Sequence, residues 1–270
     1  TLLEGLDEIL PGCDKDVSTL VRRAFVKKGI DIHTGVQVDR HEETSNKTIV
    51  SWSVGGENNQ VEVDLIIISV GREPNGQAAG LDGTEVVVDE KGFIEVDKRL
   101  QTKEKGVWAA GDVIDSPQLA HVGFAEGIFV VKEILGESPV AIDSSTVPWC
   151  IYCDPEVAFA GLTEESAKSA GYKVAVSKHR YSGNGRAMIV GETEGLVKVV
   201  AEADDEGKAG RILGVHMAGP WVTEQLGQAY LAVNLEATVD EVATHIQAHP
   251  TLSELFGETV MSLTGRSLHG

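Results

Sequence analysis

The most informative short segment lies near the carboxyl terminus, where a histidine and a carboxylate stand five residues apart in His249-Pro-Thr-Leu-Ser-Glu254. Proline disfavours helix at the residue before it, so we expect His249 in an extended loop. Pro250 suits the first position of a helix, which places Glu254 in the first turns, within reach of the loop. A carboxylate on one ring nitrogen orients an imidazole and strengthens it as a base. Because imidazole and thiol pKa values are about 6.5 and 8.5, such a pair suits proton exchange with a dithiol. An ordinary His-Pro turn followed by a helix acid is the alternative.

A second candidate site lies where a short apolar stretch, residues 106–110, runs directly into Gly111-Asp112. A helical stretch follows over residues 119–135. In open α/β sheets, ligands bind at the carboxyl ends of strands, where loops and helix starts gather. Asp112 is therefore placed to offer a hydrogen-bond acceptor to a ligand, and Gly111 lets the backbone approach it. An aspartate that only caps a helix is the alternative.

The elements that would position these residues change character near residue 146. Before it, helix and strand patterns alternate, and the apolar run 65–70 predicts a strand buried on both faces. After it, the pattern predicts an α+β domain, with an antiparallel sheet and helices on one side. The elements expected before residue 146 are strands at 1–4 and 30–33, a helix at 17–25, and hairpins of 47–54 with 60–63 and of 86–88 with 93–96. The strands expected after it are 147–152, 157–160, 173–177, 196–201 and 212–217. The helices expected there are one opened by Thr163 and those at 222–233, 239–244 and 252–262.

Composition narrows the function classes. The 270 residues are 42% apolar and 24% charged, as in a globular protein with a substantial core. Twenty-three basic and 42 acidic residues give a net charge of −19, which argues against a nucleic-acid partner. No apolar run approaches the roughly 18 residues of a membrane span, so none is predicted.

The cysteines do not form a disulfide framework. Cys13, Cys150 and Cys153 are three in number, which favours a reducing compartment. Trp149-Cys150-Ile-Tyr-Cys153 matches a W-C-x-x-C redox pattern, but the run is strand-like on both sides and lacks the helix start that lowers a thiol pKa. We therefore expect structural cysteines. The histidines and cysteines show no metal-ligand spacing, so no metal site is predicted.

Ordered segments along essentially the whole chain resemble the pyridine nucleotide–disulfide oxidoreductases. The junction Gly71-Arg-Glu-Pro-Asn75 is similar to their strand-G-R-x-P-N sequence, and Val107-Trp-Ala-Ala-Gly-Asp-Val113 to their second flavin motif. The remaining segments of the resemblance are 118–127, 146–165, 214–220 and 249–254.

The resemblance implies two cofactors, FAD and NAD. Asp112 matches the acid that binds the flavin ribitol, and Leu119, Ala120 and His121 match the residues beside the isoalloxazine ring. A helix start at these residues would direct amide dipoles toward the ring.

Three residues match the NAD site of the family. Glu4 corresponds to the acid at a strand end that accepts hydrogen bonds from ribose hydroxyls and repels a 2′-phosphate, which favours NAD over NADP. Val38 corresponds to a backbone contact near the adenine. Gly71 corresponds to the glycine at which the chain passes close to the dinucleotide.

In the same resemblance, His249 is the acid–base catalyst and Glu254 its orienting partner. The family's His loop reaches across a homodimer into the other subunit's site, and its His-Pro bond is cis.

The expected fold class is accordingly α/β plus α+β: the remainder of Rossmann-like FAD/NAD-binding domains, followed by an interface domain. We expect a partial NAD-binding domain over 1–70, a central FAD-contacting segment over 71–145 and a dimerisation domain over 146–270. The first flavin glycine loop, the redox-active cysteine pair and the NAD-domain glycine loop of the family have no counterpart here. We therefore expect the carboxyl-terminal portion of a longer enzyme.

Within the family, Leu119-Ala-His121 with Glu126-Gly127 is most similar to the dihydrolipoamide dehydrogenases. This implies oxidation of protein-bound dihydrolipoamide with NAD, a lipoyl domain of a 2-oxo acid dehydrogenase complex as partner, and a cytoplasmic location (the mitochondrial matrix in a eukaryote). A glutathione- or mercury-directed reductase is a second interpretation. Glu4 opposes the NADP preference of the former, and the end Arg266-Ser-Leu-His-Gly270 lacks the cysteine pair of the latter. A third is a non-catalytic dimerisation module.

Overall fold

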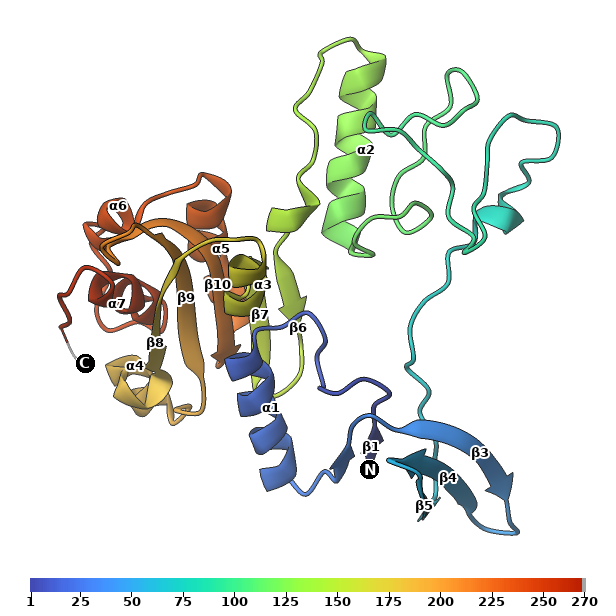
Figure 1. Ribbon diagram of the computed structural model, residues 1–270, viewed down its shortest axis with the longest axis horizontal. Helices are drawn as coiled ribbons and strands as arrows, with labels where there is room; N and C mark the ends of the chain where they lie inside the picture. The colour runs from blue at the N-terminus through green and yellow to red at the C-terminus, as the bar shows by residue number, and fades with distance from the viewer. Residues whose placement is uncertain (269–270) are drawn as a thin grey trace. The chain divides into compact units, whose positions relative to one another are not determined.

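The computed structural model describes residues 1–268 (Figure 1). They form two compact units: residues 1–66 pack with those from 148 onward, and residues 67–147 form the other unit. Within residues 1–268, no helix is both long enough and apolar enough to cross a membrane.

The carboxyl-terminal part is built on a five-stranded antiparallel sheet. Successive residues of a strand point to opposite faces. On β7, Val157 and Phe159 accordingly belong to one core cluster and Ala158 to another. The strands, in spatial order, are β6 (Trp149–Ile151), β7 (Glu156–Gly161), β10 (Ala209–Gly219), β9 (Leu196–Ala203) and β8 (Val174–Arg180). The predicted α+β sheet is confirmed.

Helices cover both faces of this sheet, so the expectation of helices on one side was wrong. The larger core lies under α5 (Val222–Asn234), α6 (Val239–Ala243) and α7 (Glu254–Ser262). The short helix α4 (Gly185–Val190), which follows the 3-10 turn η3 (Tyr181–Gly183), borders the same core. The opposite face carries α1 (Lys15–Lys27) and α3 (Glu164–Ser169). The reason is that α1, from the amino-terminal part of the chain, packs Val17 and Val21 onto the face of β7 and β10 that lies opposite α5.

The amino-terminal part contains two further small sheets. β1 (Leu2–Leu3) and β2 (Ile32–His33), both predicted as strands, pair in parallel. β4 (Thr48–Val54) and β5 (Glu57–Val63) form the predicted hairpin, joined at Gly55-Gly56. The third strand, β3 (Gln37–Glu43), was not predicted because its residues are mostly charged and polar and all are exposed.

A buried charge cluster joins α1 to the interface sheet. Nζ of Lys198 on β9 lies 2.9 Å from Oδ1 of Asp14, 2.7 Å from Oδ2 of Asp16 and 2.8 Å from Oε2 of Glu164. Burial alone would lower the pKa of Lys198, but its hydrogen bonds to Asp16, Glu164 and Asp14 raise it. Lysine is almost never fully buried unless it is paired, so these carboxylates are what allows the cation to lie inside the unit.

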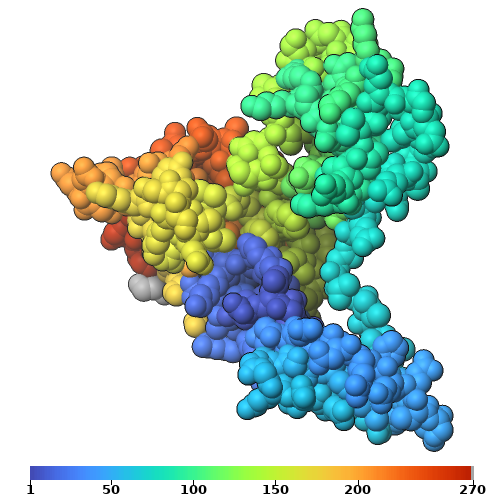
Figure 2. All heavy atoms as spheres, turned by 45° about the vertical axis from the view of Figure 1, so that its right-hand side comes forward, coloured from blue at the N-terminus to red at the C-terminus, as the bar shows by residue number. Residues whose placement is uncertain are grey.

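The predicted strand at 65–70 was wrong. Leu65, Ile67, Ile68 and Val70 are largely exposed, and no described residue pairs with the run. Figure 2 shows this stretch (cyan) as a thin thread of atoms. A run buried on both faces requires hydrogen-bonded neighbours on either side, and none of the described segments provides them.

The unit of residues 67–147 contains one long helix, α2 (Ala120–Ile134), as predicted. The 3-10 turns η1 (Gly76–Ala79) and η2 (Ser144–Thr146) are its other helical elements. The predicted strand at 106–110 and the predicted hairpin of 86–88 with 93–96 are reduced to single bridges, Gln101 to Trp108 and Val88 to Ile94. Its core is correspondingly small and is centred on Ile94, Ala109 and Ile114.

Candidate active site

The loop between α6 and α7 brings His249 and Glu254 together. Nδ1 of His249 lies 2.9 Å from Oε2 of Glu254. The imidazole is 66% exposed, whereas the Glu254 side chain is only 7% exposed. The His249–Pro250 peptide bond is cis. The imidazole of His249 is therefore exposed, and its Nδ1 is held by the buried carboxylate of Glu254.

Thr251 closes the loop. Its hydroxyl donates to the carbonyl of Ala248 at 2.8 Å and accepts from the backbone N–H of Glu254 at 3.2 Å. Helix α7 begins at Glu254, two residues after the start of the predicted helix 252–262, so Pro250 lies in the loop and not at the first helical position. Glu254 is the first residue of α7, so its carboxylate lies at the positive end of the helix.

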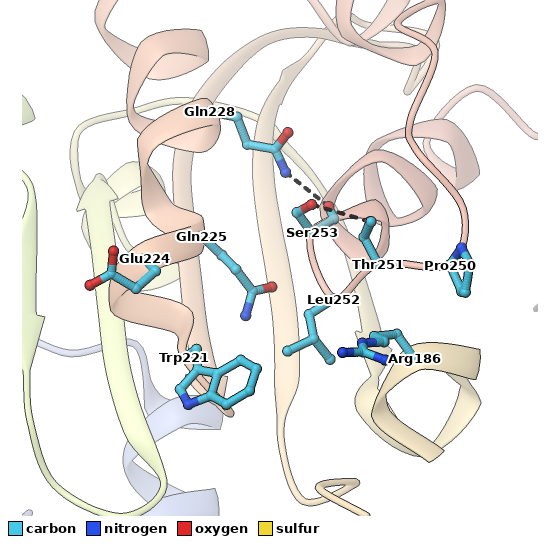
Figure 3. Close-up of a pocket in the computed structure, with 9 residues that line it drawn as sticks. All are labelled: Arg186, Trp221, Glu224, Gln225, Gln228, Pro250, Thr251, Leu252 and Ser253. Carbon is cyan, nitrogen blue, oxygen red and sulfur yellow. Dashed lines mark hydrogen bonds between the residues drawn. The ribbon is translucent and has the colours of Figure 1, made fainter. Parts of the chain in front are cut away.

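Helix α5 holds the same loop from the side. Nε2 of Gln228 donates to the carbonyl of Ser253 at 2.8 Å, as Figure 3 shows. Between α5 and the loop lies a cavity of about 620 Å³. Its lining includes Trp221, Glu224 and, from α4, Arg186. The loop therefore has a rigid support on one side and an open, mixed polar and apolar surface beside it.

Sequence reasoning missed one residue of this arrangement, Asn184. Its amide Nδ2 lies 3.4 Å from Oε1 of Glu254. The available signal was an asparagine directly before a short helix, which predicts a cap. The contact with Glu254, 70 residues away, leaves no pattern in the sequence.

The candidate flavin residues lie together within the unit of residues 67–147. Oδ2 of Asp112 accepts a hydrogen bond from Nη2 of Arg72 at 2.6 Å. Gly111 has φ +80°, and a Cβ there would meet no atom within 4 Å, so the backbone beside Asp112 is open to close approach. The backbone N–H of Gly111 donates to Oε2 of the buried Glu126 on α2 at 2.6 Å.

The start of α2 completes this group. Leu119 is its N-cap residue and carries no side-chain cap, and Ala120 and His121 form its first turn with exposed side chains. A helix start of this kind carries a partial positive charge. A carboxylate acceptor, an open glycine and a positive helix end fit the hydroxyls and the electron-rich edge of a flavin.

The candidate NAD residues are divided between the units. Glu4 follows β1, and its Oε1 accepts from the backbone N–H of Leu6 at 2.9 Å. Val38 on β3 is exposed and pairs with Trp52. Gly71, in the other unit, has φ +134° with no atom within 4 Å of a Cβ position. The assignment of these three residues to NAD stays a prediction.

The cysteines show the features of structural residues. Burial raises the pKa of the Cys13 thiol to about 12, and burial also raises the pKa values of Cys150 and Cys153. A redox-active thiol requires the opposite shift. No group of three or more metal-ligating side chains occurs in the part of the chain that the structure describes.

Comparison with known proteins decides the family. Residues 1–127 match the pyridine nucleotide-disulphide oxidoreductase family, and residues 147–260 match the dimerisation domain of the same family. The chain belongs to the pyridine nucleotide–disulphide oxidoreductases. The expected family and fold are thereby confirmed.

Named relatives are consistent with this family. The chain is 40% identical to a dihydrolipoyl dehydrogenase of Bacillus subtilis over 271 residues, covering 100% of this chain and 56% of the relative. A dihydrolipoyl dehydrogenase of Haloferax volcanii is 35% identical, with the same coverage. The chain thus spans about half the length of these relatives.

A solved structure gives the same architecture. The HOCl-induced flavoprotein disulfide reductase RclA from Escherichia coli superposes with a TM-score of 0.86 at 25% identity. The match covers 96% of this chain and 58% of that one. The fold of this chain is therefore similar to that of the reductase over nearly the whole chain.

Proposed function

We propose that this chain supplies the acid–base pair, part of the cofactor site and the dimer interface of an FAD-dependent dihydrolipoyl dehydrogenase. The observation that carries the proposal is the contact of 2.9 Å between Nδ1 of His249 and Oε2 of Glu254. The names of the relatives support the choice of dihydrolipoyl groups as substrate.

The pair acts on the protons of the substrate dithiol. Because Glu254 holds Nδ1, proton exchange with a thiol falls to the other ring nitrogen, Nε2, of the exposed imidazole. His249 takes the thiol proton, and the thiolate so formed attacks a disulfide. The proposal does not assign that disulfide to Cys13, Cys150 or Cys153, because burial raises the pKa values of these thiols, opposite to the shift of a redox-active thiol. Glu254 keeps the ring in the orientation that proton transfer requires.

The cofactors would be held by residues already described. Asp112, Leu119, Ala120 and His121 would bind FAD, and Glu4, Val38 and Gly71 would bind NAD. When bound, FAD carries the electron pair from the dithiol to NAD. The match of residues 147–260 to the dimerisation domain supports a homodimer. The lipoyl domain of a 2-oxo acid dehydrogenase complex would present the substrate.

The substrate choice is tested with the FAD-loaded full-length enzyme that contains this chain. We expect dihydrolipoamide with NAD to be turned over at least about 100-fold faster than reduced glutathione with NADP, because a site built for one polar partner rejects another strongly. A preference for glutathione and NADP would favour the glutathione-type interpretation.

A second candidate is a non-catalytic dimerisation module. Two observations favour it. The interface sheet has a buried core formed by its own strands and helices, and the apolar run 65–70 is exposed instead of lying within a sheet. Sizing chromatography combined with flavin absorbance of the isolated chain distinguishes the two. A dimer without flavin supports the module, and bound yellow FAD contradicts it.

A further inference from the structure

Asn184 connects two segments that lie far apart in the sequence, the start of α4 and the loop that leads into α7. Its side chain is almost completely buried, at 2% exposure. Its Oδ1 accepts from the backbone N–H of Ala187 at 2.9 Å and so caps α4. Its Nδ2 donates to the carbonyl of Thr251 at 3.0 Å and faces Oε1 of Glu254 at 3.4 Å.

The orientation of this amide is determined by its partners. A backbone N–H can only donate and a backbone carbonyl can only accept, so Ala187 fixes the oxygen and Thr251 fixes the nitrogen. The group that faces Glu254 is therefore an N–H donor. Each carboxylate oxygen of Glu254 then has its own donor: Asn184 at Oε1 and His249 at Oε2.

This arrangement limits rotation of a buried carboxylate. If Oε1 lost its donor, the carboxylate could turn to share one oxygen or recruit another partner, because a buried acceptor without a hydrogen bond is costly. We propose that Asn184 is a positioning residue, which holds Oε1 of Glu254 so that Oε2 stays directed at Nδ1 of His249. The proposal rests on the proposed function of the His249–Glu254 pair.

A cap alone does not explain the contacts of Asn184. Thr163 caps α3, another helix of six residues, with its hydroxyl 3.0 Å from the N–H of Ser166. The Thr163 hydroxyl also donates to the hydroxyl of Ser166 at 3.0 Å, so both of its contacts stay within the first turn of α3. Asn184 makes the equivalent contact with Oδ1 and in addition directs two donors at the His249 loop and at Glu254.

Few other side chains near the loop are placed to hydrogen-bond Oε1 of Glu254. The charged side chains that line the adjoining cavity are Arg186 from α4 and Glu224 from α5. Gln228 from α5 binds the backbone of Ser253, not the carboxylate. Among the described residues, neutral Asn184 thus provides a side-chain donor to Oε1 of Glu254.

Two substitutions separate the cap from the donor. In Asn184→Ser, the hydroxyl still caps α4 but is too short to reach Glu254. In Asn184→Asp, the cap oxygen remains and the donor is replaced by an acceptor. Thr163→Ala is the matched control, since it removes the cap of a helix of the same length away from the pair.

The first readout is dihydrolipoamide oxidation by the FAD-loaded full-length enzyme that carries these substitutions. We expect both Asn184 variants to lower kcat/KM about tenfold, mainly through kcat, because a hydrogen bond to a charged group is lost. Thr163→Ala should keep the kcat/KM of the unsubstituted protein. Unchanged kinetics in both Asn184 variants would overturn the inference.

The second readout does not depend on activity. In the ¹⁵N-histidine spectrum of the full chain, the Nδ1–H proton of His249 should be visible in the unsubstituted protein and in Thr163→Ala, and should exchange at least tenfold faster in Asn184→Ser. Equal exchange in all three would overturn the inference. His249→Gln and Glu254→Gln are run in the same kinetic assay. If neither lowers dihydrolipoamide oxidation, the proposed function fails, and the exchange measurement still decides the role of Asn184.

Discussion

Nζ of Lys198 lies 2.9 Å from Oδ1 of Asp14, and both side chains are almost fully buried, at 3% and 2% exposure. Lys198 belongs to the interface sheet and Asp14 caps α1, the helix of the amino-terminal part. The two parts match different family models, residues 147–260 the dimerisation domain and residues 1–127 the pyridine nucleotide-disulphide oxidoreductase model. This pair therefore fixes one part against the other within a single unit.

Replacing Lys198 should destabilise that unit strongly. In Lys198→Met, Asp14 would remain buried without its cation, and breaking a buried pair costs about 3–5 kcal/mol. Lys178→Met is the control, because Lys178 also contacts Asp16, at 3.0 Å, but is 57% exposed and should cost no more than about 1 kcal/mol. Urea unfolding measures both. Equal stability of the two variants would show that the cluster does not hold α1 to the sheet.

The same cluster predicts loss of stability in acid. Burial would raise the pKa of Asp16, but hydrogen bonds from Lys198 and Lys178 outweigh it and lower the pKa. Hydrogen bonds from Lys168 and Lys198 also lower the pKa of Glu164. A carboxylate with a lowered pKa stabilises the fold at pH values above the ordinary carboxyl pKa of about 4. This contribution is lost as the pH falls through the lowered pKa.

Stability measured by urea unfolding should therefore fall as the pH drops below about 4. The fall should be smaller in Lys198→Met, in which these carboxylates have already lost their main partner. At alkaline pH the direction is reversed, because the pKa of Lys198 is raised. Its contribution to stability is fully present at pH values below the ordinary lysine pKa of 10.5, and this contribution is lost as the pH rises through the raised pKa. An identical acid profile in both proteins would contradict this reasoning.

Asp112→Asn should weaken FAD binding. The carboxylate would lose its charge-assisted hydrogen bonds to flavin hydroxyls, and we expect the Kd for FAD to rise roughly tenfold. The measurement is flavin fluorescence titration of the flavin-free protein. Asp115→Asn, at an exposed position three residues later, is the control and should leave the Kd unchanged. Equal affinities would remove Asp112 from the flavin site.

Much of the fold could be predicted because the patterns are local. The apolar spacing of Val17, Val21 and Ala24 produces one buried face of α1, and all three are buried. The contact between His249 and Glu254 was also predictable, since a loop restricted by proline and a helix start five residues later leave few alternatives.

The errors arise where structure depends on distant partners. The run 65–70 has the composition of a buried strand, but composition does not supply hydrogen-bonded neighbours, and the run is exposed. Lys198 lies within an apolar strand, and its partners Asp14 and Asp16 stand 184 and 182 residues away. Asn184 was recognisable as a helix cap only. Nothing local to these positions indicates which distant group will meet them.

The central claim is that His249, oriented by Glu254, removes the proton from a substrate thiol. The most direct test is rapid-mixing measurement of flavin reduction by dihydrolipoamide in the FAD-loaded full-length enzyme with the substitution His249→Gln, with FAD content measured in parallel. The account predicts a rate at least 100-fold lower, in the usual range of about 10²–10⁴ for loss of a general base, with FAD content unchanged. A rate within about twofold of the unsubstituted protein would contradict it.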